Sequence, residues 1–359
     1  MTDFKRLGDI ATYINGYAFK PEDRGNEGLP IIRIQDLTGN SYDLGFYNGE
    51  YPERIEINDG DVLISWSGSL GVYLWNKGKA LLNQHIFKVV FDKAEIDKSY
   101  FIYAIQHHLK EMETKTHGAT MKHITKKDFD NMLVPYPDMQ KQREIAGILS
   151  TVDRIIASCQ QELTKLDEFV KSRFIELFGD PVKNPMGWKL HRFNSLCENL
   201  DSRRRPIPAS EREAGINPYY GASGIVDYVA DYIFDENILL VSEDGANLLM
   251  RSTPIAFSVS GKVWVNNHAH VVRFEKMSMQ KYIEVFFSLI DISDHITGSA
   301  QPKLNQAKLN AMMFPVPSDE RLDAFLRFIE QTDKSKLVVQ QSLEKLETLK
   351  KSLMQQYFG

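Results

Sequence analysis

The chain has 359 residues, of which 43% are hydrophobic, and a formal net charge of −5. This length predicts two or three domains with ordinary hydrophobic cores. It contains no run of 18 apolar residues, and the N-terminal segment MTDFKRLGDI lacks the pattern of a signal peptide, so we expect no membrane span and a cytoplasmic location. The two cysteines and the absence of a CxxC spacing exclude a disulfide framework and argue against structural zinc.

The first 137 residues have the pattern of a mixed α/β domain. Stretches rich in β-branched and aromatic residues predict strands at 29–36, 61–65, 72–75 and 86–91. A helix is predicted over 100–110. Small residues (WSGSLG, 66–71) predict a loop after the second strand, and a basic loop, KTHGATMKH, ends this part.

A long helix is predicted next, within residues 138–181. Residues 139–178 contain no proline and a single glycine, and Gly-Asp-Pro follows at 179–181 as a helix stop. Forty residues would extend about 60 Å. Apolar residues recur at steps of three and four along one stripe, which predicts packing against a second helix. The stripe consists of Ile145, Leu149, Val152, Ile156, Cys159, Leu163, Leu166, Val170 and Leu177.

The second helix is predicted by an internal repeat with a shift of 180 residues. Leu163, Leu166 and Phe178 match Leu343, Leu346 and Phe358, and the match continues upstream from 117–137 to 297–317. The chain is therefore two copies of one plan, with domains at 1–137 and 182–317 and helices at 138–181 and 318–359. The second helix has a weaker stripe, because Lys336 and Lys350 match Ile156 and Val170.

The polar clusters do not assemble an active site. Residues 217–220 (NPYY) are similar to the Asn-Pro-Pro-Tyr motif of amino-methyltransferases, but a tyrosine replaces the second proline and no glycine-rich cofactor turn is evident, so a turn beside a binding surface is favoured. His268 and His270 would share one face of a strand, yet no third metal ligand is near in the sequence, which favours a hydrogen-bonded pair. Phosphate-binding loops, nucleophile elbows and HExxH helices are absent.

DNA binding is the better-supported chemistry, although basic runs are more often simply solvated and the net charge is negative. Residues 203–205 (RRR) and the basic residues of 115–127 can neutralise phosphates. The loops also carry Gln, Asn, Ser, Arg and Glu side chains, which can read base edges. On residue chemistry alone a solvated surface and a DNA-binding surface both stay open.

The whole pattern resembles the specificity subunit of type I restriction-modification systems. The resemblance rests on segments in duplicate order over nearly the whole chain. In the first half these are NGYAFK (15–20), GDVLISWSGSLG (60–71), LNQHIF (82–87) and HGATMKHIT (117–125), and in the second they are YYGASGIVDYV (219–229), LLVSEDGANL (239–248), WVNNHAHVV (264–272) and TGSAQPKLN (297–305).

The resemblance implies an α/β fold with two target-recognition domains, separated by two long antiparallel conserved helices and related by a pseudo-twofold axis. It implies that each domain reads one half of a split site in double-stranded DNA. The chain itself would have no cofactor, metal or catalytic residue. Two modification (methyltransferase) subunits would dock on it, and restriction (endonuclease and translocase) subunits would join them. The alternatives are an interaction scaffold that does not bind DNA and an amino-methyltransferase.

The DNA-binding residues that the resemblance implies lie on the loops of the two domains. In the first domain they are Tyr17, Trp66, Ser67, Ser69, Gln84, His85, Thr120, Lys122 and His123. In the second they are Arg204, Tyr220, Ser223, Glu243, Asp244, Asn267, His268, Gln301 and Lys303.

Overall fold

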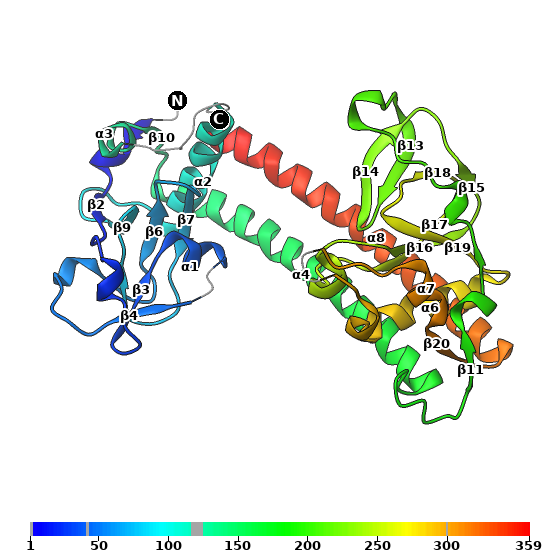
Figure 1. The fold of residues 1–359 in the computed structure, drawn as a ribbon. Coiled ribbons are helices and arrows are strands. Elements are labelled where there is room, and N and C mark those ends of the chain that lie inside the picture. The colour runs from blue at the N-terminus through cyan, green and yellow to red at the C-terminus, as the bar shows by residue number, and fades with distance from the viewer. Residues whose placement is uncertain (1–2, 41–42, 116–124, 299–300) are drawn as a thin grey trace. The chain divides into compact units, whose positions relative to one another are not determined.

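A computed structural model describes residues 3–40, 43–115, 125–298 and 301–359 (Figure 1). The chain divides into two compact units, each with its own contacts. Unit 1 comprises residues 1–159 and 342–359, and unit 2 comprises residues 160–341. The division passes through both long helices, so each unit includes a part of each. The predicted domain limits at 137, 181 and 317 stay a prediction.

Unit 1 is built on two four-stranded sheets, within the part of the chain that the structure describes. One sheet has the antiparallel order β2-β9-β6-β7, and the other has the order β4-β3-β8-β5 with β3 and β8 parallel. A short ribbon, β1-β10, joins the start of the domain to its end. The strands are β1 (Phe4–Arg6), β2 (Thr12–Asn15), β3 (Leu29–Ile32), β4 (Gly45–Tyr47), β5 (Glu56–Ile57), β6 (Val62–Ser65), β7 (Gly71–Leu74), β8 (Ala80–Leu82), β9 (Ile86–Val90) and β10 (Leu133–Pro135); the helices are α1 (Ile34–Thr38), α2 (Lys98–Lys115), α3 (Lys126–Asp130) and the first part of α4 (Met139–Phe178).

Strand β6 is buried on both faces because it lies between two cores. Val62 and Ile64 belong to a core shared with α2, the start of α4 and Phe358 of the C-terminal helix. Leu63 points the other way, into a core formed by residues of both sheets, such as Trp75 and Leu81. This alternation explains why β6 is a continuous apolar run rather than an alternating one.

Unit 2 repeats this plan element by element. Its sheets have the orders β12-β19-β16-β17 and β14-β13-β18-β15, and its ribbon is β11-β20. The strands are β11 (Lys189–Arg192), β12 (Glu198–Asn199), β13 (Ala214–Gly221), β14 (Gly224–Val229), β15 (Phe234–Asp235), β16 (Ile238–Ser242), β17 (Ala256–Val259), β18 (Lys262–Val265), β19 (Ala269–Arg273) and β20 (Met313–Val316); the helices are α5 (Asn247–Met250), α6 (Met277–Leu289), α7 (Gln306–Ala311) and the first part of α8 (Asp319–Phe358).

The repeat extends to single hydrogen bonds. The hydroxyl of Tyr100 in α2 donates to the Pro135 carbonyl at 2.9 Å, and the hydroxyl of Tyr282 in α6 donates to the Pro315 carbonyl at 2.6 Å. Strand β16 is also buried on both faces, since Leu239 and Val241 face one core and Leu240 faces the other. The predicted internal repeat is therefore confirmed at the level of topology.

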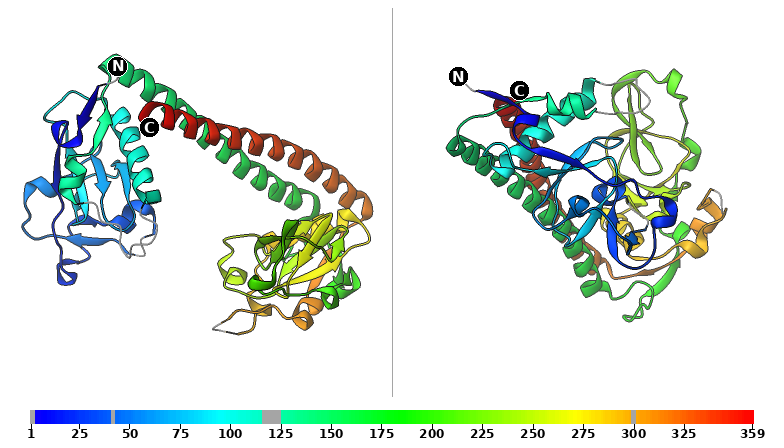
Figure 2. Two further views of the ribbon diagram at one scale, coloured as in Figure 1. Left: turned by 90° about the horizontal axis from the view of Figure 1, so that it is seen from above. Right: turned by 90° about the vertical axis from the view of Figure 1, so that its left-hand side faces the viewer.

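The two long helices run antiparallel within each unit, where they lie side by side (Figures 1 and 2). In unit 1, Lys350 of α8 pairs with Asp153 of α4 at 2.5 Å. In unit 2, Lys336 of α8 pairs with Asp167 of α4 at 2.6 Å. The two pairs have one register, because a move of 14 residues forward in α4 accompanies the same move backward in α8. The lysines that interrupt the apolar stripe of α8 thus find carboxylates on the partner helix.

Three local predictions are wrong. Residues 34–38 form a helix and not the end of a strand, because the Asp36 carboxylate accepts the backbone N–H of Arg33 at 2.8 Å and caps it. Asn217 lies in strand β13, where its side-chain amide donates to the Ala230 carbonyl, so the NPYY segment is not a turn. Cys159 is half-buried and not fully buried.

Candidate nucleic-acid interface

In unit 1, backbone hydrogen bonds bring four predicted residues together at one end of strands β6 and β9. The N–H of Gln84 donates to the Tyr17 carbonyl at 2.8 Å, and the N–H of Trp66 donates to the His85 carbonyl at 3.2 Å. His85 has a positive φ of 72°, which turns the chain into β9. The NGY motif needs its glycine here, since a Cβ on Gly16 would fall 2.0 Å from the Asn83 oxygen.

Aromatic contacts organise this end of unit 1. The Trp66 ring stacks on Phe87 with centroids 5.6 Å apart and an interplanar angle of 22°, and it meets His85 edge-on at 4.9 Å. The Trp66 indole N–H donates to the side chain of Asn15 at 3.3 Å. Tyr17 is 44% exposed and packs edge-on against Phe19. The result is a half-buried aromatic surface that can contact base edges or stack.

The remaining predicted residues of the first domain are less fixed in position. Ser67 and Ser69 lie on the loop between β6 and β7, where the Ser65 hydroxyl donates to the Ser69 carbonyl at 2.6 Å. Ser69 and Gln84 are exposed. Thr120, Lys122 and His123 lie outside the described residues.

In unit 2, equivalent backbone bonds bring the predicted residues together at the equivalent end of β16 and β19. The N–H of Glu243 donates to the His268 carbonyl at 2.9 Å, as Trp66 does to His85. Tyr220 is tied to the same edge because its carbonyl accepts the N–H of Asn266 at 3.0 Å. The Ser242 hydroxyl donates to the Ala222 carbonyl, which places exposed Ser223 and the β13–β14 turn beside them.

An ion network, rather than an aromatic stack, organises this end of unit 2. Arg204 Nη1 donates to Glu243 Oε2 at 2.6 Å, and Lys303 Nζ lies 3.1 Å from Oε1 of the same carboxylate. Burial raises the pKa of Glu243, but the bonds from Arg204 and Lys303 and the charge of His270 outweigh it and hold the pKa below its ordinary value. Both oxygens of Glu243 are thus engaged inside the protein.

The loops around the network carry the other predicted residues. The Asp244 carboxylate holds His268 Nδ1 at 2.9 Å, and it lies beside Lys303 through a backbone bridge. His268 is 49% exposed at its side chain, and Asn267 and Gln301 are exposed too. Arg204 is only 14% exposed, so it is committed to internal contacts and its guanidinium is poorly placed to meet a phosphate.

Sequence reasoning missed Asp201 and the role of His270. Asp201 Oδ2 lies 2.6 Å from His270 Nδ1, and Asp201 Oδ1 accepts the N–H of Val271 at 2.8 Å. The preference for a hydrogen-bonded pair over a metal site is consistent with these contacts of His268 and His270. Asp201 carries no local signal, because its partners lie about 70 residues further along the chain.

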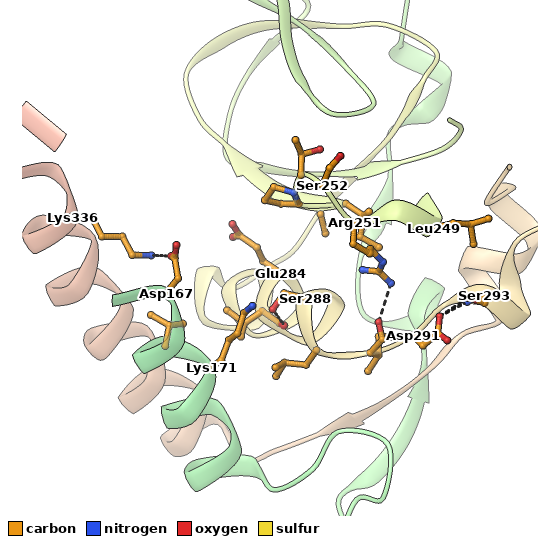
Figure 3. Close-up of a pocket in the computed structure, with 18 residues that line it drawn as sticks. Asp167, Lys171, Leu249, Arg251, Ser252, Glu284, Ser288, Asp291, Ser293 and Lys336 are labelled. Atoms are coloured by element: carbon orange, nitrogen blue, oxygen red, sulfur yellow. Dashed lines mark hydrogen bonds and ion pairs between the residues drawn. The ribbon is translucent and has the colours of Figure 1, made fainter. Parts of the chain in front are cut away.

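Unit 2 also has a pocket of about 780 Å³ between the long helices, α6 and the segment after α5 (Figure 3). Its lining includes Asp167, Lys171, Arg251, Glu284 and Lys336, which are of both signs. Arg251 donates to the carbonyls of Phe287 and Ile290 at the end of α6, and so has a structural role. The predicted DNA-binding residues do not line this pocket.

Among the described residues, no group of three or more His, Cys, Asp and Glu side chains is arranged to hold a metal ion. The same part of the chain has no helix that is long and apolar enough to span a bilayer. Burial raises the pKa of the Cys197 thiol to about 12.

Comparison with known proteins identifies relatives along both halves of the chain. The chain is 26% identical over 214 residues to the EcoBI type I restriction enzyme specificity subunit of Escherichia coli, which covers 59% of this chain and 45% of that one. It is 24% identical to the MjaVIII type I restriction enzyme specificity subunit of Methanocaldococcus jannaschii, over 97% of this chain and 90% of that one. The chain thus spans less than half of the E. coli subunit and most of the archaeal one.

A solved structure shares the fold. The type I restriction-modification S subunit from M. genitalium matches with a TM-score of 0.58 at 15% identity, over 100% of this chain and 96% of that one. The sequence model described as the type I restriction modification DNA specificity domain matches residues 2–168 and again residues 185–348. Two matches that together cover most of the sequence, one for each half of the structural repeat, show that the chain belongs to the type I restriction modification DNA specificity domain family.

Proposed function

We propose that this chain is the DNA-recognition subunit of a type I restriction-modification enzyme. Unit 1 and unit 2 each read one half of a split site in double-stranded DNA. Partner subunits, two for modification and others for restriction, carry out adenine methylation and cleavage. The chain supplies sequence recognition and no catalytic residue.

The observation that supports this proposal best is a shared framework with different chemistry at equivalent positions. The backbone bond from Trp66 to His85 corresponds to the bond from Glu243 to His268. An aromatic surface in unit 1 thus takes the place of a charged one in unit 2. Two readers of one design with unlike side chains suit a site whose two halves differ in sequence.

The methyltransferase alternative has little support. The Asn217 side chain is 8% exposed, and its amide donates to the Ala230 carbonyl at 2.8 Å. It is therefore not available to bind an adenine amino group. We expect the pure chain not to bind S-adenosylmethionine, and calorimetry on the full chain tests this; micromolar binding would favour the alternative.

Mapping of methylated adenines by single-molecule sequencing tests the proposal. The chain would be produced with its modification subunits in cells, and the genome sequenced for wild type, Trp66→Ala and His268→Ala. We expect Trp66→Ala to relax one half of the methylated motif and His268→Ala to relax the other. No methylated split motif with the wild-type chain would contradict the proposal.

Matched controls lie at the opposite ends of the same sheets. Lys77 follows β7 and lies beside the start of β6, since Gly60 bonds to Trp75 there. Lys262 begins β18, beyond the turn that follows the partner of the start of β16. Both lysines are exposed, and their substitution by alanine should leave the motif unchanged.

A further inference from the structure

His270 is a fully buried histidine whose two ring nitrogens both face hydrogen-bond acceptors. Its side chain is 1% exposed. Nδ1 lies 2.6 Å from Asp201 Oδ2, and Nε2 lies 2.8 Å from the backbone carbonyl oxygen of Leu304. A neutral imidazole has one donor and one acceptor nitrogen, so it can satisfy only one of these contacts.

Neither acceptor can act as the donor instead. A backbone carbonyl has no proton, so Nε2 must carry one. Burial raises the pKa of Asp201, but the bonds from His270 and the Val271 N–H and the charge of Arg204 outweigh it and hold the pKa below its ordinary value. Asp201 is therefore ionised at neutral pH, and Nδ1 must carry a proton as well.

The surroundings of the ring suit a cation. Glu243 Oε2 lies 3.7 Å from Nδ1, so two carboxylates face the ring. Arg204 contacts both Asp201 and Glu243, Lys303 contacts Glu243, and the Gln306 amide lies 3.3 Å from Asp201. These groups come from the segment before β13, the loop after β16, the loop before α7, and α7 itself. The ring thus joins segments that converge only in the folded unit.

The equivalent position in unit 1 has no ionisable group. In unit 2, β16 and β19 pair Val241 with His270, and in unit 1, β6 and β9 pair Ile64 with Phe87. Phe87 therefore corresponds to His270. Phe87 stacks under Trp66, whereas His270 lies under Glu243. One repeat position supports the candidate reading surface by aromatic packing in one unit and by charge in the other.

We propose that His270 is a positioning residue for DNA recognition by unit 2, held as a buried imidazolium that fixes the loops carrying Arg204, Glu243 and Lys303. This role rests on the proposed function. The residues that would touch DNA lie on the same loops and at their exposed rim, such as His268. Loss of the ring's two donors should loosen these loops together, so recognition of the whole half-site should weaken rather than one base position.

The charge state can be tested without DNA. The full chain would be labelled with ¹⁵N-histidine and studied by NMR at pH 7.5, with His270 assigned by the signal missing from His270→Gln and with His268→Gln as the exposed control. Both ring nitrogens of His270 should be protonated. If His270→Gln does not fold, the wild-type spectrum still decides, because at least one histidine must show two slowly exchanging ring N–H groups. A neutral ring at this position would overturn the proposal.

The positioning role is tested with the complex that contains the modification subunits. Methylation rates would be measured on the mapped site and on sites with single substitutions in each half. His270→Phe, which gives unit 2 the residue of unit 1, should reduce discrimination at every position of the unit 2 half-site at least tenfold and change the other half less than twofold. Asp201→Asn, which keeps the side-chain shape, should act in the same direction.

Unchanged discrimination in both variants, or an equal loss in both halves of the site, would overturn the positioning role. If the wild-type complex discriminates in neither half, the proposed function fails instead. The NMR result then still decides whether His270 is a buried cation.

Discussion

Replacing Glu243 by glutamine should weaken unit 2 by an amount that the geometry bounds. The substitution keeps the shape of the side chain but removes its charge, which is held by Arg204 at 2.6 Å and by Lys303 at 3.1 Å. Hydrogen bonds to charged groups contribute roughly 1.5–3 kcal/mol, and the glutamine oxygen keeps part of this. Because the Glu243 side chain is only 12% exposed, little of the effect is lost to solvent screening. We expect a loss of about 1–2 kcal/mol in the free energy of unfolding of unit 2.

Hydrogen exchange of amides in β16 and β19 measures this free energy for unit 2 alone, where protection should fall roughly 5–30-fold. The pKa of Glu243 is below its ordinary value of 4.5, so its stabilising effect is present above pH 4.5 and is lost as the pH falls through the folded pKa. The difference between wild type and Glu243→Gln should therefore be constant from pH 7 to 5 and shrink below 4.5. Glu198→Gln is the control, because Glu198 bonds to Arg273 but is 57% exposed. An effect of Glu243→Gln no larger than that of Glu198→Gln would refute the reasoning.

Two further predictions concern the repeated framework. Tyr100→Phe and Tyr282→Phe should each destabilise their own unit by about 1–3 kcal/mol, because the buried carbonyl of Pro135 or Pro315 loses its donor; hydrogen exchange resolved by unit checks this, and loss in the wrong unit would count against the repeat. Exchange of the charges in one helix pair, Asp153→Lys with Lys350→Asp, should restore most of the stability that either single change removes, by up to about 1 kcal/mol for a pair this exposed; a double-mutant cycle by thermal unfolding measures the coupling, and a coupling of zero would mean that the pair does not select the register.

The sequence predicts the parts of this fold that have a local or periodic signal. The helix over Met139–Phe178 is predicted to the residue, because an apolar stripe and a Gly-Asp-Pro stop define it. The strand over 34–36 is mispredicted, since β-branched residues outweigh a cap that depends on the single side chain of Asp36. The partners of Asp201 are unpredictable from local pattern, because they join segments that only the sheet brings together.

For the candidate sites, the sequence predicts which loops converge but not what each side chain does. Glu243 is predicted to read a base, and that stays a prediction, but its carboxylate is engaged by Arg204 and Lys303. Its internal role depends on residues 39 positions before and some 60 after it, which no local motif contains. Trp66 is closer to expectation, since it presents an aromatic ring on the loop where the motif places it.

The most direct test of the account is a half-site exchange. Residues 1–137 would be replaced by the corresponding part of a family member with a known and different target, and the methylated motif mapped in cells with the modification subunits. We expect one half of the split motif to change to that of the donor, while the other half and its sequence stay as in the parent chain. A change in both halves, or a change in neither, would contradict the claim that the two units read DNA independently.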